Sequence, residues 1–266
     1  MNKLLFIILF LSLFFSCNEE IDRDITTDLS QEADQFFNFS TAIDEGGYLG
    51  NFSYSDYFRT QSQSLPGCPK IEIDQNLRLV TLDYNAADSC TQEKKFKRIG
   101  KIKIDFSQSN SQLATWWMEY ENYQFNHIEI IGKREFKSIS TSQNQEKFEN
   151  LKIKTESGLS FVVKGTHTYF TSRFSFRPFA LSFVGFMDGI NPAGRKFTQT
   201  LTQAKEVYIN CYSDGWVLPI KGEETWTVER SEGRELTYRF NFSSEGECNP
   251  QVNALLPDGR TLILNP

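Results

Sequence analysis

Polar and apolar residues alternate through much of the chain after Cys68. In residues 101–106, Lys-Ile-Lys-Ile-Asp-Phe, the alternation is strict, as in a β-strand with one face in water. Similar segments follow at hairpin distance, separated by turn residues such as Gly132, Gly158 and Gly194. Because parallel strands need long crossovers, short turns predict an all-β antiparallel meander or sandwich of about ten or more strands. The expected strands are residues 71–74, 80–84, 101–106, 115–125, 127–136, 148–155, 159–170, 179–187, 196–201, 225–229 and 238–242.

Only one segment has the pattern of a substantial helix. Asp28 is a suitable N-cap, and Gln31 follows three residues later as a capping-box partner. The Gly46-Gly47 pair predicts the end of this helix. We expect residues 48–67 to form an irregular connection and residues 138–146 to form a polar loop. The apolar residues at helical spacing are Leu29, Ala33, Phe36, Phe37 and Ile43.

The N-terminus has the features of a lipoprotein signal. Lys3 precedes an apolar run of twelve residues, 4–15, and Ser16-Cys17 follows directly. Twelve apolar residues are too few to span a bilayer comfortably. The end of the run resembles a bacterial lipobox, although Phe14 and Phe15 depart from its usual residues. The resemblance implies that residues 1–16 are a signal peptide and that Cys17 is lipidated. An ordinary secretory signal is the alternative.

The segment behind Cys17 is acidic, Asn-Glu-Glu-Ile-Asp-Arg-Asp, and we interpret residues 17–27 as a solvated tether. In Bacteroidota such a run resembles the signal that sends lipoproteins to the outer face of the outer membrane. Loss of residues 1–16 removes one lysine and changes the net charge from −6 to −7. An acidic chain does not favour a nucleic-acid partner, since phosphate binding needs a basic surface.

A short unit occurs twice, once near each end of the predicted sheet. Residues 80–84, Val-Thr-Leu-Asp-Tyr, precede Cys90 by a five-residue loop, and residues 238–242, Tyr-Arg-Phe-Asn-Phe, precede Cys248 in the same way. Each copy has another strand just upstream, so both units are predicted hairpins. With residues 28–67 as a helix and connection, we interpret residues 68–266 as one β-domain that carries this unit at both ends.

Four cysteines remain after lipidation of Cys17. An envelope protein lies in an oxidising space, so we expect two disulfides, for which three pairings exist. In each half of the chain, one cysteine precedes the hairpin and the other closes the loop behind it. This arrangement predicts the pairs Cys68 with Cys90 and Cys211 with Cys248.

Several short motifs occur in a fixed order along the chain: Asp83-Tyr84 with Cys90, Gly100, Glu121-Asn122-Tyr123, Asn126, Gly132, Gly158, Asn191 to Gly194 before Phe197-Thr198, and Cys211 ahead of Gly222. Their order is similar to that of an uncharacterised family of Bacteroidota outer-membrane lipoproteins, over roughly residues 28–266. The resemblance implies an all-β envelope protein and supplies no activity.

Residues with catalytic or metal-binding chemistry are sparse. His127 and Glu129 would point the same way on a strand, but a metal site needs a third ligand and the cysteines lack CxxC spacing, so we expect no metal and no cofactor. No GxSxG, HExxH or phosphate-binding glycine loop occurs. Glu119 and Glu121 illustrate that carboxylates are plentiful, and such pairs are usually solvated strand faces.

Three tryptophans are candidate ligand-stacking residues: Trp116, Trp117 and Trp216. Neighbours in a strand face opposite sides, so one of the adjacent pair is expected in the core. Our leading hypothesis is a lipid-anchored, noncatalytic structural or binding protein that contacts the membrane through its lipid and an envelope protein or glycan. A surface glycan-binding lipoprotein and a carboxylate-dependent hydrolase are the alternatives. An exposed aromatic row would favour glycans, and two carboxylates facing each other across a deep cleft would favour hydrolysis.

Overall fold

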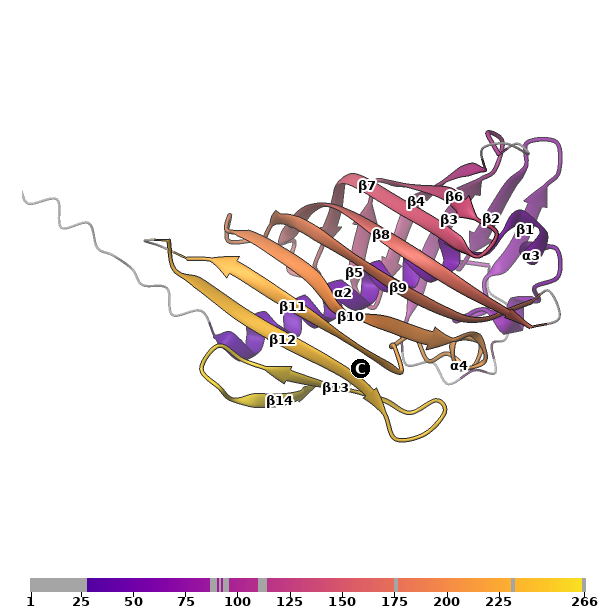
Figure 1. Ribbon diagram of the computed structural model, residues 1–266. Coiled ribbons are helices and arrows are strands. Elements are labelled where there is room, and N and C mark those ends of the chain that lie inside the picture. The colour runs from indigo at the N-terminus through magenta and orange to yellow at the C-terminus, as the bar shows by residue number, and fades with distance from the viewer. Residues whose placement is uncertain are drawn as a thin grey trace, which may run out of the picture.

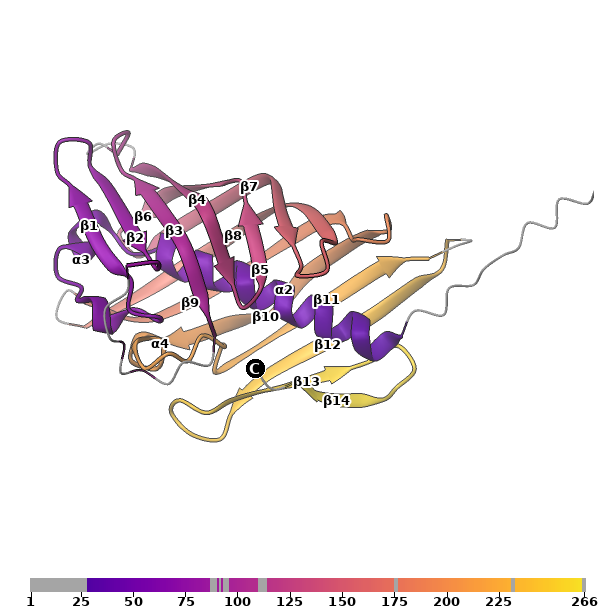
Figure 2. The same cartoon turned by 180° about the vertical axis from the view of Figure 1, so that it is seen from behind.

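One antiparallel sheet of fourteen strands curls around a long helix, α2 (Leu29–Gly50), which lies along its inner face (Figures 1 and 2). The predicted all-β antiparallel class is confirmed. The described part of this computed structural model comprises residues 28–86, 90, 92, 96–109, 114–174, 177–230 and 233–264. The signal segment, Cys17 and the tether lie outside it.

The strands follow one another along the chain as a meander. Each strand pairs with the next, with one exception. The two strands β5 and β6 each pair with both β4 and β7. The strands are β1 (Lys70–Asp74), β2 (Leu79–Asp83), β3 (Arg98–Asp105), β4 (Thr115–Phe125), β5 (Ile128–Ile131), β6 (Lys133–Ser140), β7 (Gln143–Lys154), β8 (Ser160–Phe174), β9 (Arg177–Ile190), β10 (Lys196–Tyr208), β11 (Lys221–Glu229), β12 (Glu235–Ser244), β13 (Pro250–Leu255) and β14 (Thr261–Leu264). Short helical segments are α3 (Tyr54–Tyr57), η2 (Ser62–Ser64) and α4 (Ile209–Ser213).

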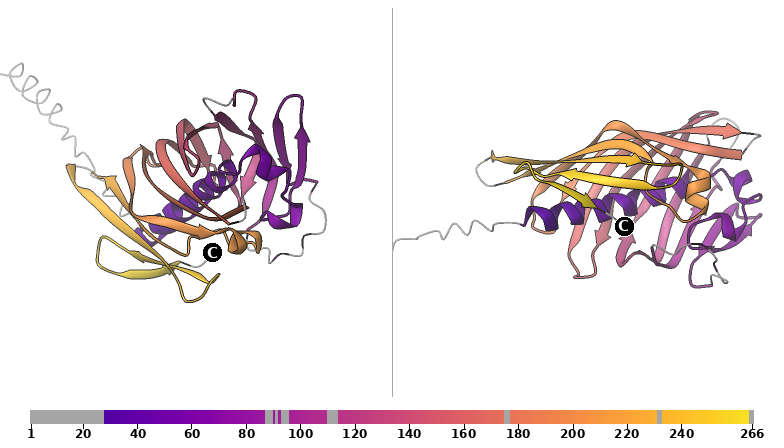
Figure 3. Two further views of the ribbon diagram at one scale, coloured as in Figure 1. Left: turned by 45° about the vertical axis from the view of Figure 1, so that its right-hand side comes forward. Right: turned by 90° about the horizontal axis from the view of Figure 1, so that it is seen from below.

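Helix α2 begins where the sequence predicts and ends later than predicted. The Asp28 carboxylate accepts hydrogen bonds from the backbone N–H groups of Ser30 (2.9 Å) and Gln31 (3.4 Å). The expected stop at Gly46-Gly47 is wrong, because the helix continues to Gly50. A Cβ atom at any of these three glycines would overlap a side chain of the sheet. Helix α2 runs along the inner side of the curled sheet (Figure 3). The glycines allow a close approach between helix and sheet, and this packing outweighs their low helix propensity.

Two expectations between β4 and β7 were wrong. Residues 127–136 form two strands rather than one, since the backbone breaks at Gly132 (φ +131°) and His127 lies in the turn before β5. The predicted polar loop, residues 138–146, is mostly strand, because β6 and β7 pair here with one register shift between Ser138 and Ser140. Strand pairing uses backbone groups, which polar side chains on a wet face do not disturb.

Both predicted disulfides are confirmed: Cys68 is joined to Cys90 and Cys211 to Cys248, with Cα–Cα distances of 5.5 and 5.2 Å. Each bond connects the chain before a hairpin to the loop behind it. The two regions also meet, because Gln92 Nε2 donates hydrogen bonds to the carbonyls of Gln63 (2.7 Å) and Ser213 (2.5 Å).

Candidate functional site

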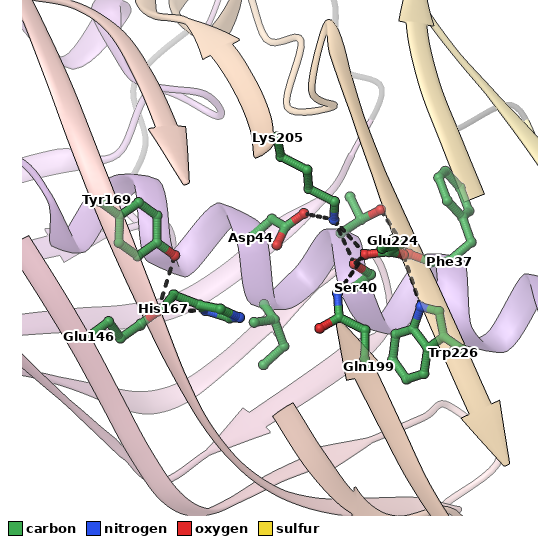
Figure 4. A network of polar contacts seen from close by, with 12 residues as sticks. Phe37, Ser40, Asp44, Glu146, His167, Tyr169, Gln199, Lys205, Glu224 and Trp226 are labelled. Carbon is green, nitrogen blue, oxygen red and sulfur yellow. Dashed lines mark hydrogen bonds and ion pairs between the residues drawn. The ribbon is translucent and has the colours of Figure 1, made fainter. Parts of the chain in front are cut away.

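A buried lysine connects α2 to the sheet (Figure 4). Lys205 Nζ lies 2.6 Å from Asp44 Oδ2 on α2 and 2.7 Å from Glu224 Oε2 on β11. Burial acts to lower the pKa of Lys205, but the two carboxylates outweigh burial and raise the pKa above its ordinary value. Glu224 accepts further hydrogen bonds from Ser40 Oγ (2.8 Å), Gln199 Nε2 (2.8 Å) and Trp226 Nε1 (3.0 Å).

A second buried cluster surrounds Arg134 on β6. Its guanidinium pairs with Glu146 on β7 and donates to the Ile43 carbonyl of α2 at 2.8 Å. Glu146 Oε2 also lies 3.1 Å from His167 Nδ1 and 3.1 Å from the Tyr169 hydroxyl. Burial acts to raise the pKa of Glu146, but Arg134 and His167 outweigh it and lower the pKa to about 2.

Two more ion pairs complete the contact between helix and sheet: Glu45 with Arg98, and Glu32 with Arg230. The carboxylates of both pairs are almost fully buried. Glu45 also accepts a hydrogen bond from the Tyr123 hydroxyl, and Glu32 accepts one from the Tyr238 hydroxyl. These clusters position α2 against the sheet. Their side chains are at most 10% exposed, so these clusters offer little surface to a ligand.

A large hollow lies on the outer face of the sheet, across strands β7 to β12, and has a volume of about 740 Å³. We call it the outer groove. Short side chains form its middle, since Thr198 on β10 is directly opposite Thr227 on β11. On β9, Phe186 and Asp188 are paired with Thr200 and Thr198. This volume is within the range typical of small-molecule sites.

Phe186 is the most exposed aromatic residue of the outer groove, with 55% of its surface accessible. Its direct cross-strand neighbours are Thr166 on β8 and Thr200 on β10, so small hydroxyl-bearing residues flank the ring on both sides. Val162 and Ile190, paired across β8 and β9, add an exposed apolar surface farther along the groove, beyond the Lys164–Asp188 pair. The ring therefore offers an accessible face with hydroxyl groups close by.

The charge of the outer groove is mostly negative. Glu229 and Glu235 are directly opposite each other on β11 and β12, and both are exposed. Lys164 Nζ lies 3.5 Å from Asp188 Oδ2, a weak surface pair. With Glu149 and Lys196, four carboxylates and two ammonium groups line the groove. The two opposed glutamates stand side by side on neighbouring strands and do not face each other across a deep cleft.

The structure separates the three predicted stacking residues. Trp116 lies in the core, 5% exposed, with its ring stacked on Phe106 and Phe136, and its Nε1 donates to the Gly50 carbonyl at 2.7 Å. Trp117 is half-buried on the opposite face of β4, beneath the ammonium group of Lys133 at 5.3 Å. Trp216 follows α4 in the chain and is half-buried. None of the three lines the outer groove.

The residues considered for metal binding or hydrolysis are also apart from the groove. His127 approaches Glu156 at 3.9 Å, while Glu129 pairs with Lys154 at 3.4 Å. Glu119 and Glu121 pair with separate lysines on the exposed face. Among the described residues, no group of three or more His, Cys, Asp or Glu side chains is arranged to hold a metal ion.

Neither Phe186 nor any other residue of the outer groove was among the site residues predicted from the sequence. The segment 181–187, Leu-Ser-Phe-Val-Gly-Phe-Met, contains apolar residues at both odd and even positions. Such a run breaks the alternation expected of a strand with one wet face. It was a usable signal that the outer face of β9 is apolar as well.

Comparisons with protein-family models, curated proteins and solved structures found no match to this chain. The similarity to Bacteroidota lipoproteins therefore stays a prediction. No helix within the described residues has the length and apolar character needed to cross a bilayer.

Proposed function

We propose that this protein is a lipid-anchored binding protein of the bacterial outer membrane, and that its outer groove holds a neutral glycan. The observation that carries this proposal is the exposed ring of Phe186 in a groove lined by hydroxyl and carboxylate groups. The anchor at Cys17 and the outer-membrane location rest on the sequence alone.

A glycan suits the chemistry of the outer groove. The apolar face of a sugar ring packs on an exposed aromatic ring, which provides a large contact area with little loss of side-chain freedom. Threonine hydroxyls and carboxylates such as Thr198 and Glu229 supply the donors and acceptors that sugar hydroxyls require. Because the lining has two more negative than positive groups, it disfavours sulfated or phosphorylated chains.

Binding of glycans to the full-length protein in detergent tests this function. We expect a glycan array to identify neutral oligosaccharides, and calorimetry to show that Phe186→Ala weakens their binding by about tenfold or more. Phe58→Ala is the matched control, since Phe58 is 49% exposed on the surface after α3 and does not line the groove. Equal glycan binding by wild type and Phe186→Ala would exclude the outer groove as the glycan site. If the protein captured a protein partner and no glycan, the proposed ligand class would be wrong.

The anchor has its own test. We expect Cys17→Ser to abolish labelling by a palmitate analogue and to leave the precursor uncleaved by lipoprotein signal peptidase. Normal lipidation of this variant would contradict the anchoring proposal without affecting the groove.

A further inference from the structure

A second pocket lies beside the C-terminal end of α2, where β2, β4, β6, β7 and β8 bring their ends or flanking turns together. Its volume is about 350 Å³. Trp116 and Phe106, stacked at 5.8 Å between ring centroids, form the apolar part of its lining. We call it the helix-end pocket.

The lining of the helix-end pocket is rich in hydrogen-bond donors. Arg78 and Arg173 contribute guanidinium groups, and Asn51 and Asn144 contribute amides. No carboxylate side chain is present among its described lining residues, in contrast with the four in the outer groove. Its hydroxyl groups come from Ser53, Tyr54, Ser55, Ser109, Ser138, Ser140, Thr141, Ser142 and Thr171.

Arg78 holds an unusual backbone conformation at the rim of this pocket. Its φ is +52°, in the left-handed region that is uncommon for residues other than glycine. The Asp74 carboxylate accepts the N–H groups of Asn76 (2.9 Å) and Leu77 (3.0 Å), and Phe106 N donates to the Arg78 carbonyl at 2.9 Å. These bonds stabilise the turn.

The Arg78 guanidinium lies over the Tyr54 ring, 5.2 Å from its centroid, and forms no ion pair within the described residues. A cation held on an aromatic ring keeps its N–H groups available for an anion.

The guanidinium group of Arg173 is held in place by Asp56. Its two terminal nitrogens bind the Asp56 carboxylate at 3.0 and 2.8 Å, and Ser53 Oγ donates to the same carboxylate at 2.7 Å. Burial acts to raise the pKa of Asp56, but the hydrogen bonds from Arg173 and Ser53 outweigh it and lower the pKa. Asp56 balances one of the two arginines, which leaves the charge of Arg78 unbalanced.

The Tyr54 hydroxyl is a donor without a partner. It is buried and forms no hydrogen bond within the described part of the chain. A buried hydroxyl without a hydrogen-bond partner lowers the stability of the folded protein. Tyr54 also belongs to the lining of the helix-end pocket. An acceptor bound in the pocket is one way to satisfy it.

We propose that the helix-end pocket binds the anionic oxygen group of a small molecule, such as a sulfate, phosphate or carboxylate group. Arg78 supplies the unbalanced charge, and Tyr54 and the surrounding serines supply neutral donors. Trp116 and Phe106, 5% and 2% exposed, form only a small part of the surface that the molecule meets. This site is separate from the outer groove and has the opposite charge preference.

Titration calorimetry of the full-length protein in detergent tests the proposal, with sodium sulfate, sodium phosphate and sodium glucuronate at constant ionic strength. We expect saturable one-site binding of at least one anion, and the three arms distinguish the class of oxygen group. Arg78→Gln should weaken binding by roughly tenfold or more. Arg260→Gln should leave it unchanged, because Arg260 is equally charged but lies in the exposed turn before β14.

A second variant keeps the test informative if Arg78→Gln disturbs the β1–β2 turn. Tyr54→Phe retains the ring and its packing on Phe58 and Phe106, and removes only the hydroxyl. We expect it to weaken anion binding several-fold while the melting temperature stays near that of wild type. Absence of saturable binding for all three anions, or equal affinity of wild type and both variants, would overturn the proposal. Neither result bears on glycan binding at Phe186.

Discussion

Neighbouring residues on β7 show how differently the two faces of the sheet use charge. Glu146 faces the helix and pairs with Arg134, and both side chains are 0% exposed. Lys147, the next residue, faces water and pairs with Glu149, with side chains 60% and 62% exposed. Both contacts are ion pairs, but only the first is shielded from solvent. Coulombic attraction is strong at low dielectric and weak in water, so the two faces should respond very differently to mutation.

The inner face uses its ion pairs to define the position of α2. Three acidic residues along the helix, Glu32, Asp44 and Glu45, each meet a different cation from the sheet. A helix that slid or rotated would leave buried charges without partners, which costs several kcal/mol. Apolar contacts alone tolerate such shifts more easily, because they are not directional.

The largest effect is expected at Lys205. Lys205→Ala leaves Asp44 and Glu224 buried without their cation, so we expect the free energy of unfolding to fall by about 3–5 kcal/mol in urea titrations. The combined variant Lys205→Met, Asp44→Asn, Glu224→Gln removes all three charges and should recover part of this loss. A loss below about 1 kcal/mol for Lys205→Ala would show that the ion pairs of the inner face contribute little more to stability than exposed pairs do.

Acid should weaken the inner face through Glu146. Its folded pKa of about 2 lies below the unfolded value near 4.5, so its contribution is present above pH 4.5 and is lost as the pH falls toward 2. The shift corresponds to roughly 3 kcal/mol. We expect the difference in unfolding free energy between wild type and Glu146→Gln to shrink over this range. Glu149→Gln, on the outer face, should show a much smaller pH dependence.

The closeness of helix and sheet can be tested at Gly50. A Cβ at this position would overlap the buried ring of Phe136, so Gly50→Ala should lower the free energy of unfolding by about 1–3 kcal/mol. Helix propensity alone predicts the opposite sign. Gly158→Ala is not a clean control because of its positive φ, whereas Gly246→Ala meets no atom within 4 Å. A stabilised Gly50→Ala variant would mean that the helix lies farther from β6.

The smallest effect is expected on the outer face. Lys147→Ala breaks only the exposed pair with Glu149, at 2.8 Å, which water and salt screen. We expect no measurable change in the urea midpoint at physiological salt. A loss comparable to that of Lys205→Ala would remove the distinction between the two faces.

Local patterns predicted much of the fold because strand alternation and turn residues act over a few positions. The N-cap at Asp28 and both disulfides follow from such local features, and all three are present. The loop expected at residues 138–146 was wrong because backbone pairing between β6 and β7 does not depend on apolar side chains. The end of helix α2 was predicted too early. Gly46 and Gly47 do not end the helix, because they allow it to pack closely on side chains of distant strands.

The candidate sites depended on distant residues in the same way. The outer groove combines side chains from six strands, and the helix-end pocket joins Tyr54 to Arg78 and Arg173. The sequence by itself determined the all-β class, the one long helix of the described residues and the cysteine pairing, since these follow from short-range periodicity and spacing. Only the tertiary structure decided which charges are buried and which aromatic residues are exposed. Burial depends on how the whole sheet curls around α2, and no local pattern encodes that curvature.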